Sequence, residues 1–167
     1  TFENNASLVQ VNNAAVNSGK IIYKRNTSAM KPSDYTYWSS PVQDQVLNVL
    51  SPNTESNKFY SFANGAWFRE EGTNMMNPAG KGFIIRVPKP NIPYTNGKDI
   101  WSGPTHIQEV AFEGKPNNGL INIPVPAADK YHLIGNPYPS AMDADLFITN
   151  AINKDLITGA LYFWTHN

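Results

Sequence analysis

Residues 131–140 read YHLIGNPYPS, a short apolar run that stops at Gly-Asn-Pro before a second proline and a serine. Residues 35–42 read YTYWSSPV and show a similar order of features, with an aromatic run, a small polar pair and a proline. When Tyr35 is aligned with Tyr131, Pro41 falls on Pro137, and apolar residues at helical spacing follow both prolines. The sequence therefore predicts an internal duplication in which Pro41 and Pro137 occupy equivalent corners, each ending a strand and entering a helix.

The predicted duplication divides one β-rich domain, residues 1–167, into two unequal copies. The expected boundaries are about 19–90 for copy one, about 91–118 for a connecting hairpin region and about 119–167 for copy two. Copy two has no counterpart of the strand at Trp67-Phe68, nor of the strand that follows Gly80-Lys81-Gly82. We therefore expect the second copy to be incomplete.

Composition limits the class of protein. Hydrophobic residues make up 41% and charged residues 16% of the chain, as in a globular domain with a polar surface. Lys and Arg number 13, as do Asp and Glu, so no net field attracts nucleic acid or an anionic membrane. No apolar run approaches the roughly 20 residues of a membrane span, so no membrane insertion is expected. Cysteine is absent, which excludes disulfides, thiolate nucleophiles and cysteine-bound metals.

Turn chemistry gives the sharpest local prediction. Asn64-Gly65 separates the aromatic runs 59–62 and 67–69, and both residues of a two-residue hairpin turn need positive φ angles, which Asn and Gly tolerate. Residues 83–87 form a continuous apolar run, which predicts a strand buried on both faces.

Other elements follow from residue type and spacing. Further strands are predicted at 20–25, 35–38, 107–112, 120–125 and 161–164, with a small hairpin around Asn96-Gly97. One helix is expected to begin at Ser40-Pro41 and end at Leu50, and another to follow the capping pair Ser140 and Asp143 and to contain residues 146–148. The 13 prolines and 11 glycines keep all elements short. The predicted fold is a mainly β, antiparallel sandwich-like domain with two short helices.

Five stretches of the chain form a characteristic set: YTYWSSPV at 35–42, PAGKGF at 78–83, GKPNNG at 114–119, LIGNPYPS at 133–140 and LYFWTHN at 161–167. Together they resemble a repeat-containing module of large Bacteroidota surface proteins, particularly flavobacterial proteins exported by the type IX secretion system. In that family the module tends to precede a C-terminal sorting domain in adhesin-like proteins. The resemblance implies an extracellular or outer-surface location and supplies no catalytic residues. This chain departs from the family pattern because it stops inside the second copy.

Signatures of enzymes and metal sites are weak or missing. The sequence lacks the short motifs of serine hydrolases, zinc peptidases and nucleotide-binding loops. Gly80-Lys81-Gly82 precedes a strand, so a bulge or tight turn at Gly82 is favoured over a phosphate loop. Asp143 and Asp145 are weak calcium candidates, but roughly six ligands are needed, and an interaction with a helix N-terminus is favoured. Glu70 is expected in a solvated loop. No cofactor and no enzymatic activity are predicted.

Aromatic residues offer the one specific binding hypothesis. Sugar-binding modules stack pyranose rings on exposed aromatic side chains, with amides beside them to bind hydroxyls. Aromatic residues on strands more often fill a core, and the core is favoured for Trp38, Phe59, Phe62, Phe83 and Trp164. The remaining candidates lie near turns or proline-rich loops and could form an exposed platform: Trp67, Trp101, Tyr94 and Tyr138.

Three functions remain open from the sequence. The leading one is a non-catalytic structural or adhesive module of a secreted surface protein. The first alternative is a carbohydrate-binding module that serves a polysaccharide-degrading enzyme. The second is a filament subunit joined by strand exchange, because the predicted apolar strand 161–164 lacks a partner and should not remain a bare edge. The expected partners are accordingly other parts of a longer parent chain, neighbouring copies or glycans. Because the chain begins at Thr1 without a signal-like segment, we expect a mature or excised piece.

Overall fold

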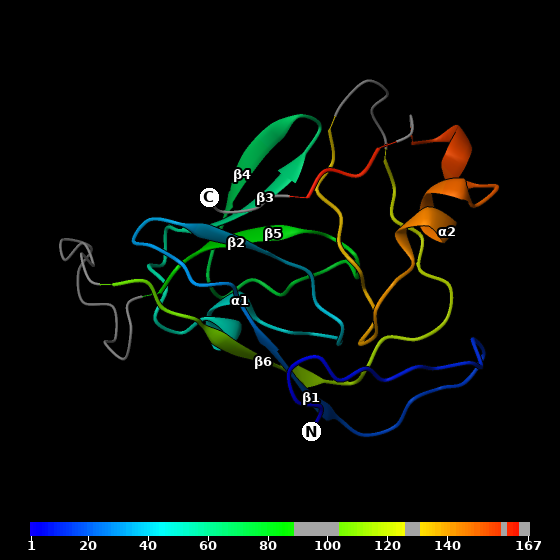
Figure 1. The fold of residues 1–167 in the computed structure, drawn as a ribbon, viewed down its shortest axis with the longest axis horizontal. Coiled ribbons are helices and arrows are strands. Elements are labelled where there is room, and N and C mark those ends of the chain that lie inside the picture. The colour runs from blue at the N-terminus through cyan, green and yellow to red at the C-terminus, as the bar shows by residue number, and fades with distance from the viewer. Residues whose placement is uncertain (89–103, 126–130, 158–159, 164–167) are drawn as a thin grey trace.

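A computed structural model of the chain describes residues 1–88, 104–125, 131–157 and 160–163. The fold is mainly β, with two antiparallel sheets in a sandwich-like arrangement (Figure 1). The strands are β1 Ile21–Asn26, β2 Tyr35–Trp38, β3 Phe59–Ala63, β4 Ala66–Glu70, β5 Phe83–Arg86 and β6 Glu109–Gly114. The helices are α1 Leu47–Leu50 and α2 Ala144–Thr149, with a 3₁₀ turn at Asn153–Asp155. The predicted fold class is confirmed.

The larger sheet has the strand order β2-β5-β3-β4. Its hairpin β3-β4 pairs Ala63 with Ala66, so the turn contains two residues, and both have positive φ, 52° at Asn64 and 78° at Gly65. The predicted hairpin is confirmed. The strand β5 lies between β2 and β3, but its burial alternates, with Phe83 and Ile85 buried and the residues between and after them half-buried. The prediction that this strand is buried on both faces was therefore wrong. A central strand has a neighbour on each side within the sheet, but only one face of β5 is covered by the core.

The smaller sheet pairs β1 with β6 over their full lengths. Both strands were predicted, with ends shifted by one or two residues. Phe2 adds a short parallel bridge to Tyr23, which ties the N-terminal segment to the sheet. The alternation of β6 places Val110 and Phe112 inside and the glutamates at 109 and 113 outside.

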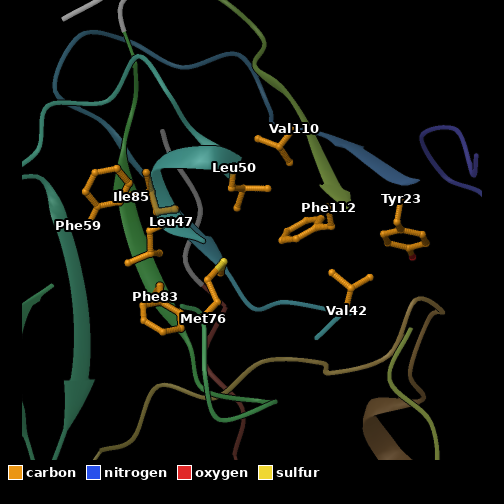
Figure 2. Packing of buried hydrophobic residues seen from close by; sticks show 10 residues of the cluster. All are labelled: Tyr23, Val42, Leu47, Leu50, Phe59, Met76, Phe83, Ile85, Val110 and Phe112. Atoms are coloured by element: carbon orange, nitrogen blue, oxygen red, sulfur yellow. The ribbon is translucent and has the colours of Figure 1, made fainter. Parts of the chain in front are cut away.

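The hydrophobic core fills the space between the two sheets. Figure 2 shows its members, which come from β1, β3, β5, β6, α1 and the loops beside them: Tyr23, Val42, Leu47, Leu50, Phe59, Met76, Phe83, Ile85, Val110 and Phe112. The short helix α1 lies between the sheets and contributes Leu47 and Leu50 (Figure 1). Every residue of this core lies between positions 23 and 112, so none of the described residues of the second predicted copy belongs to it.

The first predicted helix is much shorter than expected. Apolar spacing placed its start at Ser40-Pro41, whereas α1 begins only at Leu47. Val42 instead forms an isolated bridge with Pro116, and Asp44 has a φ angle of 58°, which a right-handed helix does not allow. The backbone of residues 41–44 is therefore held by a distant loop and not by helical hydrogen bonds.

The second predicted copy also differs from expectation. Residues 120–125 and the described part of 161–164 are not strands, and residues 133–135 form only a bridge between Ile134 and Lys81. Alternating apolar residues make a strand only where a neighbour supplies hydrogen bonds, and Pro124 cannot donate one. The helix α2 was predicted, but Asp143 rather than Ser140 caps it, by accepting from the Leu146 amide.

The two proline corners do not behave as predicted. Neither Pro41 nor Pro137 enters a helix directly, since α1 and α2 begin six or more residues further on. The duplication itself remains a prediction. The hairpin predicted at Asn96-Gly97 lies outside the described residues.

Candidate functional site

The loop GKPNNG, residues 114–119, joins parts of the chain that are distant in sequence. Its centre is Asn117, whose side chain is buried and whose exposed fraction is 5%. The Asn117 backbone N–H donates to the Pro41 carbonyl at 3.0 Å, and its Nδ2 donates to the Pro137 carbonyl at 2.9 Å. A further bond runs from Nδ2 to the Ser40 carbonyl at 3.2 Å. The two proline corners that the sequence singled out therefore meet at one asparagine.

Neighbours of Asn117 in this loop tie down the N-terminal segment. The Asn118 Nδ2 atom donates to the carbonyls of Asn12 and Ala15 at 2.9 and 2.8 Å. The Gln10 side chain donates to the Asn117 carbonyl and that of Asn17 to the Pro116 carbonyl. All of these hydrogen bonds run from a side chain to a backbone carbonyl. They hold residues 10–17 against the loop, although residues 10–17 pair with no strand. We call residues 114–119 the junction loop.

Close backbone contacts fix the junction loop further. A Cβ atom on Gly114 would lie 2.7 Å from the Gln43 carbonyl oxygen, and one on Gly119 would lie 2.8 Å from that of Asn13. Gly119 also has a φ angle of 79°. From the sequence this loop was named as one of the stretches that carry the family resemblance and not as a junction, although its Asn-Asn-Gly run was the available signal for side-chain capping of distant backbone.

A hollow of about 350 Å³ lies beside these corners, and we call it the aromatic hollow. Its walls include aromatic rings from β1, β2, β6 and the bend after Pro137, together with a guanidinium group and polar side chains: Tyr23, Arg25, Trp38, Phe112, Asn136 and Tyr138. Asn117 lines a second hollow of about 280 Å³, whose described lining includes no aromatic side chain. The aromatic hollow is therefore the better candidate for binding an organic ligand.

The rings of the aromatic hollow are held in place by specific contacts. Trp38 packs edge-on against Phe112, with ring centroids 5.7 Å apart and planes at 66°. The Tyr138 hydroxyl donates to the Gly119 carbonyl at 2.5 Å, and the Tyr138 amide donates to Asn136 Oδ1 at 3.0 Å. The hollow is thus preformed by bonds within the chain.

Arg25 forms another wall of the aromatic hollow. Its guanidinium carbon lies 3.7 Å from the centroid of the Tyr23 ring, and the group also bonds to the Tyr23 hydroxyl. It donates to the carbonyls of Ala6 at 2.5 Å, Lys24 at 2.6 Å and Glu3 at 3.3 Å. Burial lowers the pKa of Arg25 from its ordinary value. The main role of this side chain is therefore to fasten residues 3–6 against β1.

The structure separates the two described members of the predicted aromatic platform. Trp67 lies on β4, has an exposed fraction of 48% and packs against Phe62 with centroids 4.8 Å apart. Tyr138 lines the aromatic hollow, to which Trp67 does not contribute. Tyr94 and Trp101 lie outside the described residues. Of the predicted core aromatics, Phe59 and Phe83 are fully buried, whereas Trp38 and Phe62 are half-buried and Trp164 is outside the described residues.

The weak metal candidates Asp143 and Asp145 lie at the start of α2. Asp143 accepts the Leu146 amide at 2.9 Å as the cap of α2. Across residues 1–88, 104–125, 131–157 and 160–163, no group of three His, Asp or Glu side chains could hold a metal ion. Gly82 is a site of close approach, because an added Cβ would lie 2.5 Å from Leu133 Cγ.

Glu70 was expected in a solvated loop, and this was wrong. It ends β4, and its carboxylate accepts bonds from Ser61 at 2.6 Å, Lys81 at 2.7 Å and Asn74 at 2.9 Å. Burial by itself would raise the pKa of Glu70, but the three hydrogen bonds and the positive charge of Lys81 together lower it. The carboxylate links the hairpin to the loop before β5.

The fold and the junction loop define a mainly β domain in which irregular segments are fastened by asparagine side chains. The chain belongs to the family described as Domain of unknown function (DUF8693), whose model matches residues 1–167. Neither the curated proteins nor the solved structures contain a match to it. Within the described parts of the chain, no helix has the length and apolarity to cross a membrane.

Proposed function

We propose that this chain is a non-catalytic structural or adhesive module of a secreted cell-surface protein. The observation that carries the proposal is the use of polar side chains at the junction loop. Gln10, Asn17, Asn117 and Asn118 all donate to backbone carbonyls of distant segments. Groups held in this way fix architecture and are not presented to a reacting substrate.

A second feature supports a role as one module among others. Residues 131–157 and 160–163 expose several large apolar side chains, with exposed fractions of 70% at Leu146, 80% at Tyr162 and 78% at Phe163. Tyr162 packs against the exposed Tyr131 with ring centroids 5.9 Å apart, so part of this apolar surface is contiguous, and contiguous apolar surface favours contact with another protein surface. The resemblance to type IX-secreted surface proteins supports placing that contact outside the cell.

Localisation tests the proposal directly. Intact cells that express the parent protein from its own locus would be treated with a protease that does not cross membranes, and released peptides identified by mass spectrometry. We expect peptides from residues 1–167 in the released fraction, with a periplasmic marker protein retained as the control. Recovery of these peptides only after cell lysis would contradict the proposal.

A second candidate, a subunit assembled by strand exchange, is favoured by the exposed apolar residues near position 162. The strand β4 is an outer strand of its sheet among the described residues, and four of its five residues are exposed. An apolar segment of a neighbouring copy could pair with this edge. Light scattering over a range of protein concentrations would test this, with Phe163→Glu expected to abolish concentration-dependent association. Val11→Glu, at another exposed apolar position, is the matched control. A wild-type chain that stays monomeric throughout would exclude this candidate.

A further inference from the structure

We propose that the aromatic hollow binds a neutral saccharide, with one or two sugar rings seated against Trp38 and Tyr138. This activity is additional to the proposed structural role and does not depend on it. It also differs from the platform predicted from the sequence, because it uses a recess between β1, β2, β6 and the bend after Pro137 and not the hairpin at Trp67.

The size of the hollow sets the class of ligand. Its volume of about 350 Å³ lies at the lower end of the roughly 300–1,000 Å³ that is typical of small-molecule sites. A single sugar ring or a short oligosaccharide unit fits that volume. The ligand is therefore small or enters with only one end of a longer chain.

The rings supply an apolar surface that suits a sugar. A pyranose presents C–H groups on its faces and hydroxyl groups around its rim, so it can stack on an aromatic ring while its hydroxyls bond sideways. Trp38 is held by Phe112 and Tyr138 by the Gly119 carbonyl, whereas the Tyr23 ring is 5% exposed and faces the Arg25 guanidinium. Because these rings are already fixed, binding has little side-chain ordering to overcome.

Polar side chains at the rim are placed to meet hydroxyl groups. Asn5 and Ser7 line the hollow from the N-terminal segment, and Ser140 lines it from the bend after Pro139. The two sides are joined by a hydrogen bond from the Leu8 amide to the Pro139 carbonyl at 2.7 Å. Arg25, which donates to the Ala6 carbonyl between Asn5 and Ser7, fixes the other side of the same segment. The rim is therefore built from two segments that hold each other in position.

The hydrogen-bonding groups around the hollow, and not its charge, favour a neutral ligand. Among its described lining residues none is acidic, so the hollow offers no pair of carboxylates for glycoside hydrolysis and no ligand set for a cation. Arg25 is the one cation in this lining, and its N–H groups already donate to three backbone carbonyls and the Tyr23 hydroxyl. A carboxylate-bearing sugar would need donors that are engaged elsewhere, so uncharged hydroxyls are the better match.

The experiment is titration calorimetry of the full chain with neutral gluco-, manno-, xylo- and galacto-oligosaccharides, and with a trigalacturonate as the charged comparison. We expect at least one neutral oligosaccharide to bind with a dissociation constant between about 10 μM and 1 mM. Ala141→Trp places a large ring at an exposed position in the lining and should weaken binding at least about tenfold. Trp67→Ala removes the exposed aromatic ring of the hairpin and should leave binding unchanged.

A second variant keeps the test decisive if Ala141→Trp fails to fold. Asn5→Gly with Ser7→Ala removes only exposed rim side chains, and glycine tolerates the φ angle of 68° at position 5. Binding should weaken at least about fivefold, with an unchanged melting temperature. The proposal is overturned if no neutral oligosaccharide binds, if only trigalacturonate binds, or if Trp67→Ala abolishes binding that the hollow variants leave intact. Surface localisation of the protein would be unaffected by any of these results, so the two proposals fail separately.

Discussion

Two regions of the molecule differ in whether their apolar side chains build a core. In the first region, residues 1–88 and 104–125, Phe83 is fully buried and belongs to one cluster between two sheets. In the second region, residues 131–157 and 160–163, α2 has no buried residue and Leu146 is 70% exposed. The regions share a sequence pattern around Pro41 and Pro137, yet only the first builds a core.

The difference shows that strand pairing, more than local pattern, decides which apolar runs become strands. In the first region β5 has neighbours on both sides, and its apolar residues face a covered surface. The second region meets the first through the Gly82 amide to the Leu133 carbonyl at 3.1 Å and the Gly135 amide to the Gly80 carbonyl at 3.0 Å. These two bonds and Asn117 dock residues 133–137 at the margin of the larger sheet. The second region is therefore an added layer rather than a second core.

Truncating one large apolar residue in each region should give the largest difference in the free energy of unfolding. Phe83→Ala is expected to lower the free energy of unfolding by about 3–5 kcal/mol, because it leaves a cavity in a packed core. Leu146→Ala should lower it by less than about 0.5 kcal/mol, because this side chain is mostly in solvent. Urea denaturation followed by circular dichroism measures both. Equal effects would show that the second region is packed against something in solution and would break the comparison.

Removing the amide that joins the regions should have the next largest effect. Asn117→Ala deletes the bonds to the carbonyls of Ser40 and Pro137, and we expect a loss of about 2–3 kcal/mol because both acceptors lie at buried positions. Asn118→Ala removes two bonds at an exposed position and should cost less than about 1 kcal/mol. Thermal unfolding of the two variants side by side checks this. If Asn118→Ala proved the more damaging, the N-terminal segment and not Pro137 would be the main partner of the junction loop.

The elements that could be predicted from the sequence are those that local chemistry determines. The turn at Asn64-Gly65 needs positive φ at both residues, a requirement that the dipeptide itself meets. The strands β1, β2, β5 and β6 were likewise evident from β-branched and aromatic residues. The helix predicted over residues 41–46 was wrong, because the bridge of Val42 to Pro116 and the positive φ of Asp44 override the helical spacing of the apolar residues.

The candidate site was less predictable than the fold. Tyr138 was named as a possible binding residue, but Trp38 was assigned to the core, and Arg25 was not considered. The aromatic hollow brings together residues from positions 5 to 141, and no local pattern encodes a set assembled by tertiary contacts. The role of Asn117 was similarly hidden, because its partners lie 76 and 20 residues away, at Pro41 and Pro137.

A substitution in the β3-β4 hairpin of the first region should have a smaller effect on stability. Gly65→Val should lower stability by about 1–2 kcal/mol, since a β-branched residue resists the φ angle of 78°. Ala66→Val adds the same side chain one residue later, at an exposed strand position where it is tolerated. Melting temperatures of the two variants provide the measurement. An unchanged value for Gly65→Val would remove this turn from the elements that stabilise the first region.

The smallest effect is expected at Glu70, which supports the loop where the second region docks. Lys81 forms the bridge to Ile134, and its ammonium group is held by the Glu70 carboxylate at 2.7 Å. Glu70→Gln should therefore cost about 1 kcal/mol at pH 7, as expected for a charge-assisted hydrogen bond that is partly shielded from water. The exposed Glu71, which pairs with Arg69 at 3.5 Å, provides the control, and Glu71→Gln should change stability by less than about 0.5 kcal/mol.

Acid should remove the contribution of Glu70. Because its pKa is lowered in the folded state, the stabilisation is fully present above the ordinary value of 4.5 and is lost as the pH falls through the folded-state pKa. The difference in unfolding free energy between wild type and Glu70→Gln should thus shrink below pH 4.5, while that for Glu71→Gln stays near zero. Hydrogen exchange at the Gly82 and Gly135 amides, compared between wild type and Glu70→Gln at each pH, should report the same convergence. If the difference in unfolding free energy between wild type and Glu70→Gln grew in acid, the network would stabilise the protonated carboxyl group of Glu70. Lys81 would then hold the second region without the Glu70 carboxylate.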